Sequence, residues 1–269
     1  MMTIGKTFGI TVVIPAYARY DALLDAIESV TTSAIGQVEI VVVDDCSPNL
    51  VLAEKLPVYN SSGVPVRVYR LAKNSGPQSA RNLGIRRARF SFVAFLDSDD
   101  RFAPEKIDFL LGYLKQGTCD IVYHPVDTPT NINAINARWY AGRLRHLPFK
   151  YLLAALNPVY TPCLVVRRNL GLGVPLMRYC EDYAYLLNIN ARAKAVHFVP
   201  LPMTTLSRAP GSTGGLSAAL FKMRLNEFRA KKVMLRHWRF YGIDCMLISI
   251  AFGCLRILSD VLKLRYFRK

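Results

Sequence analysis

The sequence predicts an α/β protein with a mostly parallel central sheet, helices on its faces and a helical, basic C-terminal tail. Over residues 10–125, short β-branched runs alternate with helical patterns, which is typical of parallel strands joined by crossover helices. Two of these runs, 38–44 and 92–97, are continuously apolar and therefore fit strands that are buried on both faces. The 269 residues, 52% of them hydrophobic, suffice for one large domain, or for a domain of roughly 200 residues with an appendage.

The individual elements follow from the same patterns. Strands are expected at 10–14, 38–44, 66–70, 92–97 and 120–124, and helices at 21–32, 76–89 and 104–116. After residue 125 the pattern loosens into a basic, asparagine-rich connection at 127–146, helices at 148–156 and 181–193, and strands at 163–166 and 195–199. A loop rich in Gly, Ser and Thr is expected at 204–215.

Acidic residues follow the fourth expected strand. Asp97, Ser98, Asp99 and Asp100 come directly after an apolar run, and clustered carboxylates repel one another and are costly to desolvate. Carboxylates clustered in this way usually bind a hard divalent cation, and their oxygen ligands suit Mg²⁺ or Mn²⁺. The alternative is a solvated turn in which Asp100 caps the next helix.

Polar residues also follow the first two strands. Asp44 and Asp45 end the second, and Pro15 and Tyr17 follow the first. Since ligands bind beyond the carboxyl ends of strands in an open parallel sheet, these endings are expected to face one crevice with the acids at 97–100. A carboxylate there can accept a hydrogen bond from a nucleobase N–H or a ribose hydroxyl, and Tyr17 can stack on a base. An ordinary Asx turn and simple packing are the alternatives.

Two further segments carry candidate residues. The glycine-containing loop at 73–84 runs into a helix that holds Arg81, and a helix N-terminus with a guanidinium suits a diphosphate. It has neither the G-x-G-x-x-G nor the P-loop spacing. Glu181 and Asp182 open the helix at 181–193, where acids can also serve only to complement the helix dipole.

Taken together and in this order, IPAY, VVVDDCS, NSGPQSARNLG, FLDSDD and YCEDYAYLL resemble the family 2 glycosyltransferases with a GT-A fold. The resemblance covers roughly residues 10–215. It implies a nucleotide-sugar-binding half at 1–125 and an acceptor-side half of the same domain at 126–216, with the tail at 217–269.

The resemblance also implies roles for the candidate residues. Pro15 and Tyr17 would border the nucleobase. Asp45 would form a hydrogen bond with the base, and Asp44 would lie next to Asp45. Arg81 would aid the departing diphosphate. Asp97, Ser98 and Asp99 would form the D-x-D motif, in which the first acid approaches the ribose and Asp99 binds the metal. Asp182 would be the catalytic base of an inverting transfer.

The sequence departs from the family pattern at two places. Ala18 stands where the family often has Asn after the Pro-x-Tyr motif, so one polar contact of the nucleotide pocket is missing. The segment at 207–213 resembles only in part the family's later Arg and Ser positions that close over the donor, and Arg208 is its candidate residue.

The formal charge of +16 is concentrated in the tail. Residues 218–269 hold 12 Lys and Arg against 3 acids, a net +9, and residues 1–217 hold 23 against 16, a net +7. On an expected helix at 216–241, Phe221, Leu225, Phe228 and Leu235 form a stripe between basic residues; a second helix at 243–264 has an apolar face. The longest uncharged stretch of the tail, 245–255, has 11 residues, so no membrane-spanning helix is expected. An anionic membrane surface is therefore favoured over nucleic acid, with packing on the catalytic domain or a partner as the alternative.

These observations favour a metal-dependent inverting glycosyltransferase that uses a nucleotide-sugar donor, with a UDP-sugar expected. The acceptor would be a glycan or a lipid-linked molecule in bacterial polysaccharide assembly. Six scattered cysteines and the lack of a signal-peptide core favour a cytoplasmic protein at the inner face of the cell membrane. The alternatives are a sugar-nucleotide nucleotidyltransferase, whose glycine-rich signature is absent near the first strand, and a non-catalytic basic module binding membrane or nucleic acid.

Overall fold

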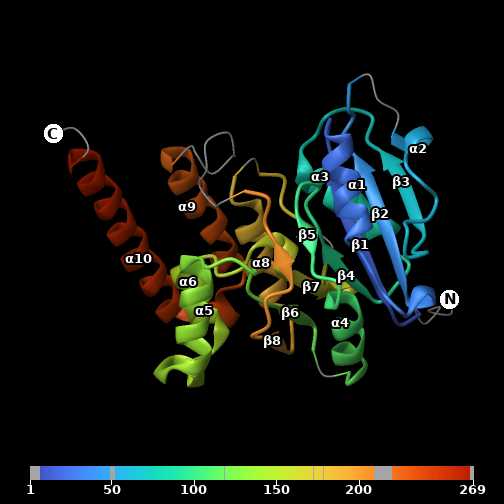
Figure 1. Cartoon of the computed structure of the whole chain (residues 1–269). Coiled ribbons are helices and arrows are strands. Elements are labelled where there is room, and N and C mark those ends of the chain that lie inside the picture. The colour runs from blue at the N-terminus through green and yellow to red at the C-terminus, as the bar shows by residue number, and fades with distance from the viewer. Residues whose placement is uncertain are drawn as a thin grey trace.

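The structure, a computed structural model, describes residues 7–48, 52–117, 119–171, 173–177, 179–208 and 220–266. Its centre is a seven-stranded sheet in the order β3-β2-β1-β4-β7-β6-β8 (Figure 1). Strands β5 and β9 form a separate two-stranded antiparallel sheet. The strands are β1 Ile10–Ala16, β2 Val38–Asp44, β3 Val66–Arg70, β4 Phe92–Phe95, β5 Arg101–Phe102, β6 Ile121–Tyr123, β7 Leu164–Arg167, β8 Val196–Phe198 and β9 Thr204–Thr205.

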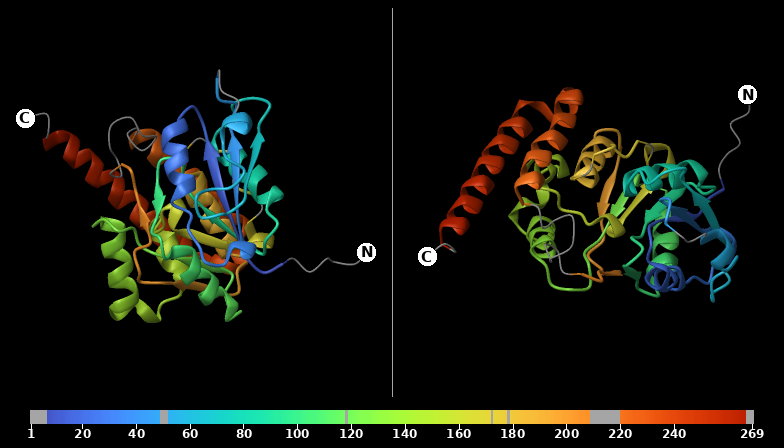
Figure 2. Two further views of the ribbon diagram at one scale, coloured as in Figure 1. Left: turned by 45° about the vertical axis from the view of Figure 1, so that its right-hand side comes forward. Right: turned by 90° about the horizontal axis from the view of Figure 1, so that it is seen from above.

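Helices cover both faces of the sheet (Figure 2). They are α1 Tyr20–Glu28, α2 Leu52–Lys55, α3 Pro77–Arg87, α4 Lys106–Lys115, α5 Asn131–Ala141, α6 Phe149–Ala155, α7 Arg168–Gly171, α8 Glu181–Asn190, α9 Leu220–Arg236 and α10 Trp238–Tyr266, with short 3-10 turns at Ile35–Gln37, Arg143–His146 and Thr161–Cys163. The expected strands and the long helices of the first half are present, with ends that differ by a few residues.

Alternating side chains of β1 divide the core between the two faces. Val12 and Ile14 pack with α1 and α4 on one face, whereas Val13 packs with α3 and α8 on the other. All seven residues of β1 and all seven of β2 are buried, as the largely apolar character of β2 predicts.

The second half of the chain completes the same sheet. Strand β7 runs antiparallel between β4 and β6, while β6 and β8 pair in parallel, so the sheet is mostly parallel as predicted. The segment 127–146 was expected to be a connection, and this expectation is wrong. It contains α5, whose N-terminus is capped by Thr130, the side chain of which accepts a hydrogen bond from the backbone N–H of Asn133.

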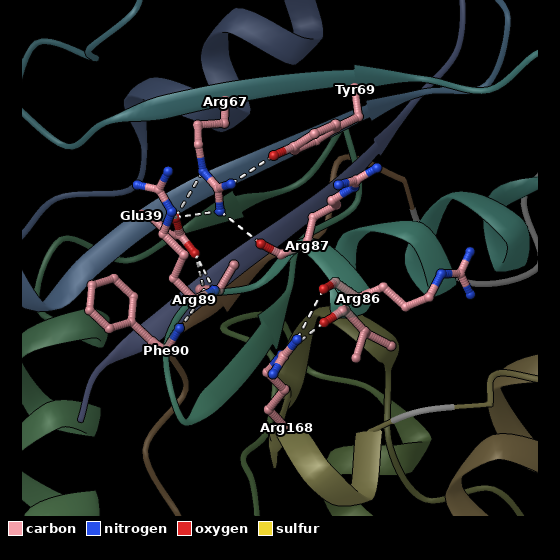
Figure 3. A network of polar contacts seen from close by, with 10 residues as sticks. Glu39, Arg67, Tyr69, Arg86, Arg87, Arg89, Phe90 and Arg168 are labelled. Carbon is pink, nitrogen blue, oxygen red and sulfur yellow. Dashed lines mark hydrogen bonds and ion pairs between the residues drawn. The ribbon is translucent and has the colours of Figure 1, made fainter. Parts of the chain in front are cut away.

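A buried ionic network stabilises the edge of the sheet at which the parallel strands β1, β2 and β3 begin (Figure 3). The carboxylate of Glu39 on β2 is buried and accepts from Thr11 at 2.7 Å and from Arg67 at 2.6 Å and 3.0 Å. It also accepts from the backbone N–H of Arg89 at 2.7 Å. Because each oxygen is bonded, this buried charge is compensated, and it ties β1, β2, β3 and the end of α3 together.

The tail forms two helices, α9 and α10, as predicted, and the non-helical residue Gly242 (φ 73°) lies where the two helices were expected to meet. The expectation that no helix could span a membrane is corrected. Among the described residues, one helix, Trp238–Asp260, is long and apolar enough to do so by length and composition, with a mean hydropathy of 1.7 and 17% of its most apolar stretch buried. Counting only uncharged residues overlooked that this helix continues through Asp244 and Arg256.

Candidate functional site

A cavity of about 710 Å³ opens where β1, β2 and β4 end and α8 begins. Its lining includes eight of the nine residues predicted for the site, namely Pro15, Tyr17, Asp45, Arg81, Asp97, Ser98, Asp99 and Asp182. The topological argument therefore holds, because residues from five separate segments meet at the carboxyl edge of the sheet.

Arg81 connects the two acidic segments of the cavity. Its Nη2 lies 2.6 Å from Oδ1 of Asp97, and its Nη1 lies 3.4 Å from Oε1 of Glu181. The Arg81 side chain is only 7% exposed. Both Nη atoms of its guanidinium thus contact protein carboxylates, so Arg81 holds these acids in place at the cavity wall. Its expected role as an aid to the departing diphosphate stays a prediction.

Asp182 lies on the first turn of α8, where its Oδ2 accepts a hydrogen bond from Nδ2 of Asn157 at 2.9 Å. Burial raises the pKa of Asp182. Burial, and the charge of Asp182 next to it, also raise the pKa of Glu181 to about 7. A raised pKa makes each carboxylate a stronger base in its ionised form, as proton abstraction requires.

Asp99 lies between two arginines. Its Oδ2 is 2.8 Å from Nη1 of Arg19 and 3.8 Å from Nε of Arg208. This places Arg208 beside Asp99, while the rest of its segment, 209–213, lies outside the described residues.

The carboxylates fit a divalent ion that binds together with a substrate diphosphate. Within the described parts of the chain, no three His, Cys, Asp or Glu side chains are grouped closely enough to hold a metal by themselves. Mg²⁺ and similar ions commonly take one or two carboxylates and complete their octahedron with water and phosphate oxygens. Asp99, with Asp97 nearby in the same loop, supplies that kind of partial, all-oxygen ligand set.

The two acids after β2 have different surroundings. Asp45 lines the cavity, and its two oxygens accept from the backbone N–H groups of Ser75 and Gly76 at 2.7 Å and 2.8 Å. Asp44 is the one predicted residue that is not part of the cavity lining. It is buried and bonds Ser47 at 2.6 Å and Arg70 at 2.7 Å, so the structure gives it a role in the fold of the loop.

The residues after β1 form one side of the cavity. Pro15, Tyr17 and Ser98 all line it, and Tyr17 is exposed, as stacking on a base requires. Ala18 has a left-handed backbone (φ 55°), and its N–H donates to Oγ of Ser47 at 2.9 Å. Asn adopts this conformation more readily than Ala, which gives a conformational reason for the family's Asn at this position.

Asp100 and Lys106 hold the segment that leads to Arg208. The buried carboxylate of Asp100 accepts from the backbone N–H of Ser207 at 2.9 Å, and burial raises its pKa to about 7. Nζ of Lys106 is fully buried and donates to Oγ1 of Thr204 at 2.9 Å and to the carbonyl of Pro162 at 2.7 Å. Asp100 was considered as a helix cap or an additional ligand, and the structure instead makes it an anchor for this loop.

Sequence reasoning missed several residues of the site, among them Arg19, Asn157, Tyr160 and Met223. Arg19 lies three residues after the end of β1. It could have been found by searching for polar residues two positions beyond Tyr17. The others carry no local signal, because their positions depend on how the second half of the chain and α9 pack against the sheet.

Comparisons with known proteins show which family the chain matches. Residues 11–168 match the family described as Glycosyl transferase family 2. An uncharacterised glycosyltransferase of Haemophilus influenzae is 26% identical over 185 residues, which cover 67% of this chain and 61% of that protein. The succinoglycan biosynthesis protein ExoO of Rhizobium meliloti is 42% identical over 108 residues, covering 39% of this chain and 29% of ExoO. The chain thus spans less than two thirds of these relatives.

Two solved structures share the fold. TarS 1–349 of S. aureus in complex with UDP-GlcNAc has a TM-score of 0.64 and 18% identity, covering 85% of this chain and 67% of TarS 1–349. The mannosyltransferase PcManGT of Pyrobaculum calidifontis, in complex with GDP-Man and Mn²⁺, has a TM-score of 0.59 and 16% identity, covering 94% and 75%. At these identities the likeness shows the GT-A type of fold alone.

Proposed function

Because the chain belongs to glycosyl transferase family 2, we propose that it is an inverting glycosyltransferase that moves a sugar from a nucleotide-diphosphate donor to an acceptor hydroxyl. The donor nucleotide would occupy the cavity at the ends of β1, β2 and β4, with Tyr17 at the base and the loop of Asp97, Ser98 and Asp99 at the ribose and diphosphate.

The observation that carries this proposal is that Asp182 and Asp99 line the same cavity. Direct displacement at the anomeric carbon needs a base on the acceptor hydroxyl and compensation of the charge on the departing diphosphate. Asp182 supplies the base. Asn157 orients its carboxylate through a 2.9 Å hydrogen bond, and burial raises its pKa, so that it holds the proton taken from the hydroxyl more firmly than an exposed Asp would.

The negative charge on the leaving group would be compensated by cationic groups held next to Asp99. A divalent ion held there by Asp99, Mg²⁺ or Mn²⁺, would supply electrostatic stabilisation of the diphosphate when bound. Arg19 and Arg208 lie at the same carboxylate and provide guanidinium donors suited to phosphate oxygens. Arg81 keeps Asp97 and Glu181 in place around this centre.

A UDP-sugar is the proposed donor, with GDP-sugars as the nearest competitors. TarS binds UDP-GlcNAc and PcManGT binds GDP-Man, which supports a nucleotide sugar in the corresponding cavity. We propose a glycan or lipid-linked acceptor in polysaccharide biosynthesis, at the cytoplasmic face of the membrane. The similarity to ExoO supports the biosynthetic setting.

Screening of purified protein with a panel of UDP-, GDP- and dTDP-sugars, with Mg²⁺ or Mn²⁺, tests the proposal through the release of free nucleoside diphosphate. One donor class should give release that Asp182→Asn lowers strongly. Glu54→Gln, a carboxylate-to-amide change on the exposed side of α2, should leave release unchanged and serves as the matched control. Equal rates in the two variants would contradict the proposed role of the cavity.

A further inference from the structure

The pair formed by α9 and α10 has a network of ion pairs between its helices and large apolar side chains on its outside. The Glu227 carboxylate lies between the helices, 2.9 Å from Arg256, 3.2 Å from Arg224 and 3.4 Å from Lys231. Arg224 also contacts Asp260 at 2.6 Å. A pair of helices in water has the reverse arrangement, with apolar side chains between the helices and charges outside.

The outer face of the pair is apolar. Its large exposed side chains include Leu225, Phe228, Ile243, Leu247, Ile250 and Leu258, and Ile243 and Leu247 are 76% and 62% exposed. On α10 these positions recur at helical spacing and form one continuous stripe. A contiguous exposed surface of this kind marks an interaction site.

Basic side chains accompany this stripe. Arg229, Lys232 and Arg236 are exposed on α9, beside Leu225 and Phe228. The three acids of residues 218–269 are all used within the protein: Glu227 and Asp260 between the helices, and Asp244 in a hydrogen bond with Tyr151. The outward charge of the pair is therefore positive, in keeping with the net +9 of this segment.

We propose that the outer face of α9–α10 docks on the surface of an anionic lipid bilayer. Apolar side chains would enter the boundary between head groups and acyl chains, and the basic side chains would lie at the anionic head groups. The opposite face of α10 is already engaged, since Tyr241 is buried and its hydroxyl donates to the carbonyl of Leu187 on α8 at 2.6 Å.

Surface docking fits the charge distribution better than a crossing of the membrane. Basic residues occur at both ends of the apolar stretch, in α9 and again at Lys263, Arg265, Arg268 and Lys269. Basic segments resist translocation, so both ends of α10 favour the same side of the bilayer.

The docked orientation would bring the catalytic cavity close to the lipid. Met223, in the first turn of α9, lines the cavity, and its carbonyl accepts from Sγ of Cys180 at 3.5 Å. The helix that carries the basic face thus begins at the cavity wall. If the proposed transferase function holds, this arrangement favours an acceptor carried by a lipid over one free in solution.

Co-sedimentation of the 269-residue chain with vesicles tests the docking. The protein should bind vesicles of phosphatidylcholine mixed with phosphatidylglycerol, and it should bind phosphatidylcholine alone far more weakly. The triple variant Arg229→Gln, Lys232→Gln, Arg236→Gln should bind the anionic vesicles about 100-fold more weakly. A second variant, Ile243→Ser with Leu247→Ser, should also lose binding without any change of charge.

The matched control removes three exposed basic side chains elsewhere, as Arg86→Gln, Lys115→Gln and Lys194→Gln, and should bind like the wild type. Circular dichroism establishes that each variant is folded. Equal binding of wild type and both tail variants would overturn the proposal. So would dimerisation on size-exclusion chromatography that Ile243→Ser with Leu247→Ser abolishes, or resistance of the bound protein to carbonate extraction, which indicates a spanning helix. Release of nucleoside diphosphate with a soluble acceptor is measured in parallel, so a failure of docking and a failure of the transferase function are told apart.

Discussion

Nη2 of Arg81 lies 2.6 Å from Oδ1 of Asp97, so a largely buried guanidinium on α3 fixes the first acid of the D-x-D motif. The same guanidinium reaches Glu181, beside the proposed base Asp182, at 3.4 Å. One side chain therefore sets the relative positions of the loop after β4, the proposed donor-binding loop, and of α8, which carries the proposed base.

Removing this guanidinium should affect both stability and donor binding. Arg81→Met leaves two carboxylates without their cation and should lower the free energy of unfolding by about 2 kcal/mol, less than for a fully buried pair because Asp97 is partly exposed. Arg81→Lys keeps the charge but not the forked geometry, so it should recover stability in part and donor affinity less well. Urea unfolding and calorimetric titration with UDP measure the two effects. A stable Arg81→Met variant with unchanged donor affinity would rule out the positioning role.

Asp99 should determine the metal dependence of donor binding. Asp99→Asn should abolish the gain in UDP affinity that Mn²⁺ gives the wild type, because the amide is a poor ligand for a divalent ion, and should leave the fold intact. Arg19→Gln is the contrasting variant. It removes the competing cation 2.8 Å from Asp99 and should strengthen Mn²⁺ binding in the absence of donor. Calorimetric titrations with UDP and with Mn²⁺, separately and together, measure both effects. If Mn²⁺ still raises the UDP affinity of a folded Asp99→Asn variant, Asp99 is not the metal ligand.

The buried Lys106 should make stability depend on pH. Burial lowers its pKa to about 7, whereas the unfolded chain has the ordinary lysine value near 10. Between these values the unfolded state binds a proton that the native state does not, so native stability rises with pH across this window, by at most about 1.4 kcal/mol per pH unit. Lys106→Met should remove this rise. Urea unfolding of both proteins from pH 7 to pH 10 checks it, and a constant difference between them would mean that Lys106 is charged in the native state.

Ala18 should be a site of backbone strain that can be relieved. Its φ of 55° is unfavourable for an L-residue with a Cβ, and Asn tolerates that region better. Ala18→Asn should therefore raise the free energy of unfolding by up to about 1 kcal/mol. Ala18→Val, which is β-branched, should lower it. Thermal unfolding of both variants tests the direction, and destabilisation by Asn equal to that by Val would contradict the strain argument.

Much of the fold and of the site could be predicted because the signals are local. The apolar run of β2 and the acids after β4 predict buried parallel strands and a ligand edge, and eight of the nine predicted residues line the cavity. The carboxyl-edge rule needs only the order of strands and helices, which periodicity supplies.

The remaining features depend on packing that local patterns do not encode. Asp44 and Asp45 are adjacent and chemically identical, yet their side chains point in different directions. Because of the strand pleat and the loop after β2, Asp44 contacts Arg70 and Asp45 lines the cavity. Helix α5 was missed because its asparagines suggested a loop, whereas Thr130 caps it and Asn136 is buried with its Nδ2 bonded to the carbonyl of Pro158. The inverted α9–α10 pair is visible only once both helices are placed side by side.

The central claim, that Asp182 is the base of a glycosyl transfer in this cavity, is tested most directly by the single-turnover rate of Asp182→Asn, with donor affinity measured on the same protein. The rate should fall by about 10²–10⁴ and the affinity for UDP should change little, because the base acts on the acceptor hydroxyl. In the wild type the rate should rise with pH through a pKa above the usual Asp range, because burial raises the pKa of Asp182 and only its ionised form accepts the proton. A rate that survives in Asp182→Asn, or a loss of UDP binding with the rate constant intact, would contradict the account.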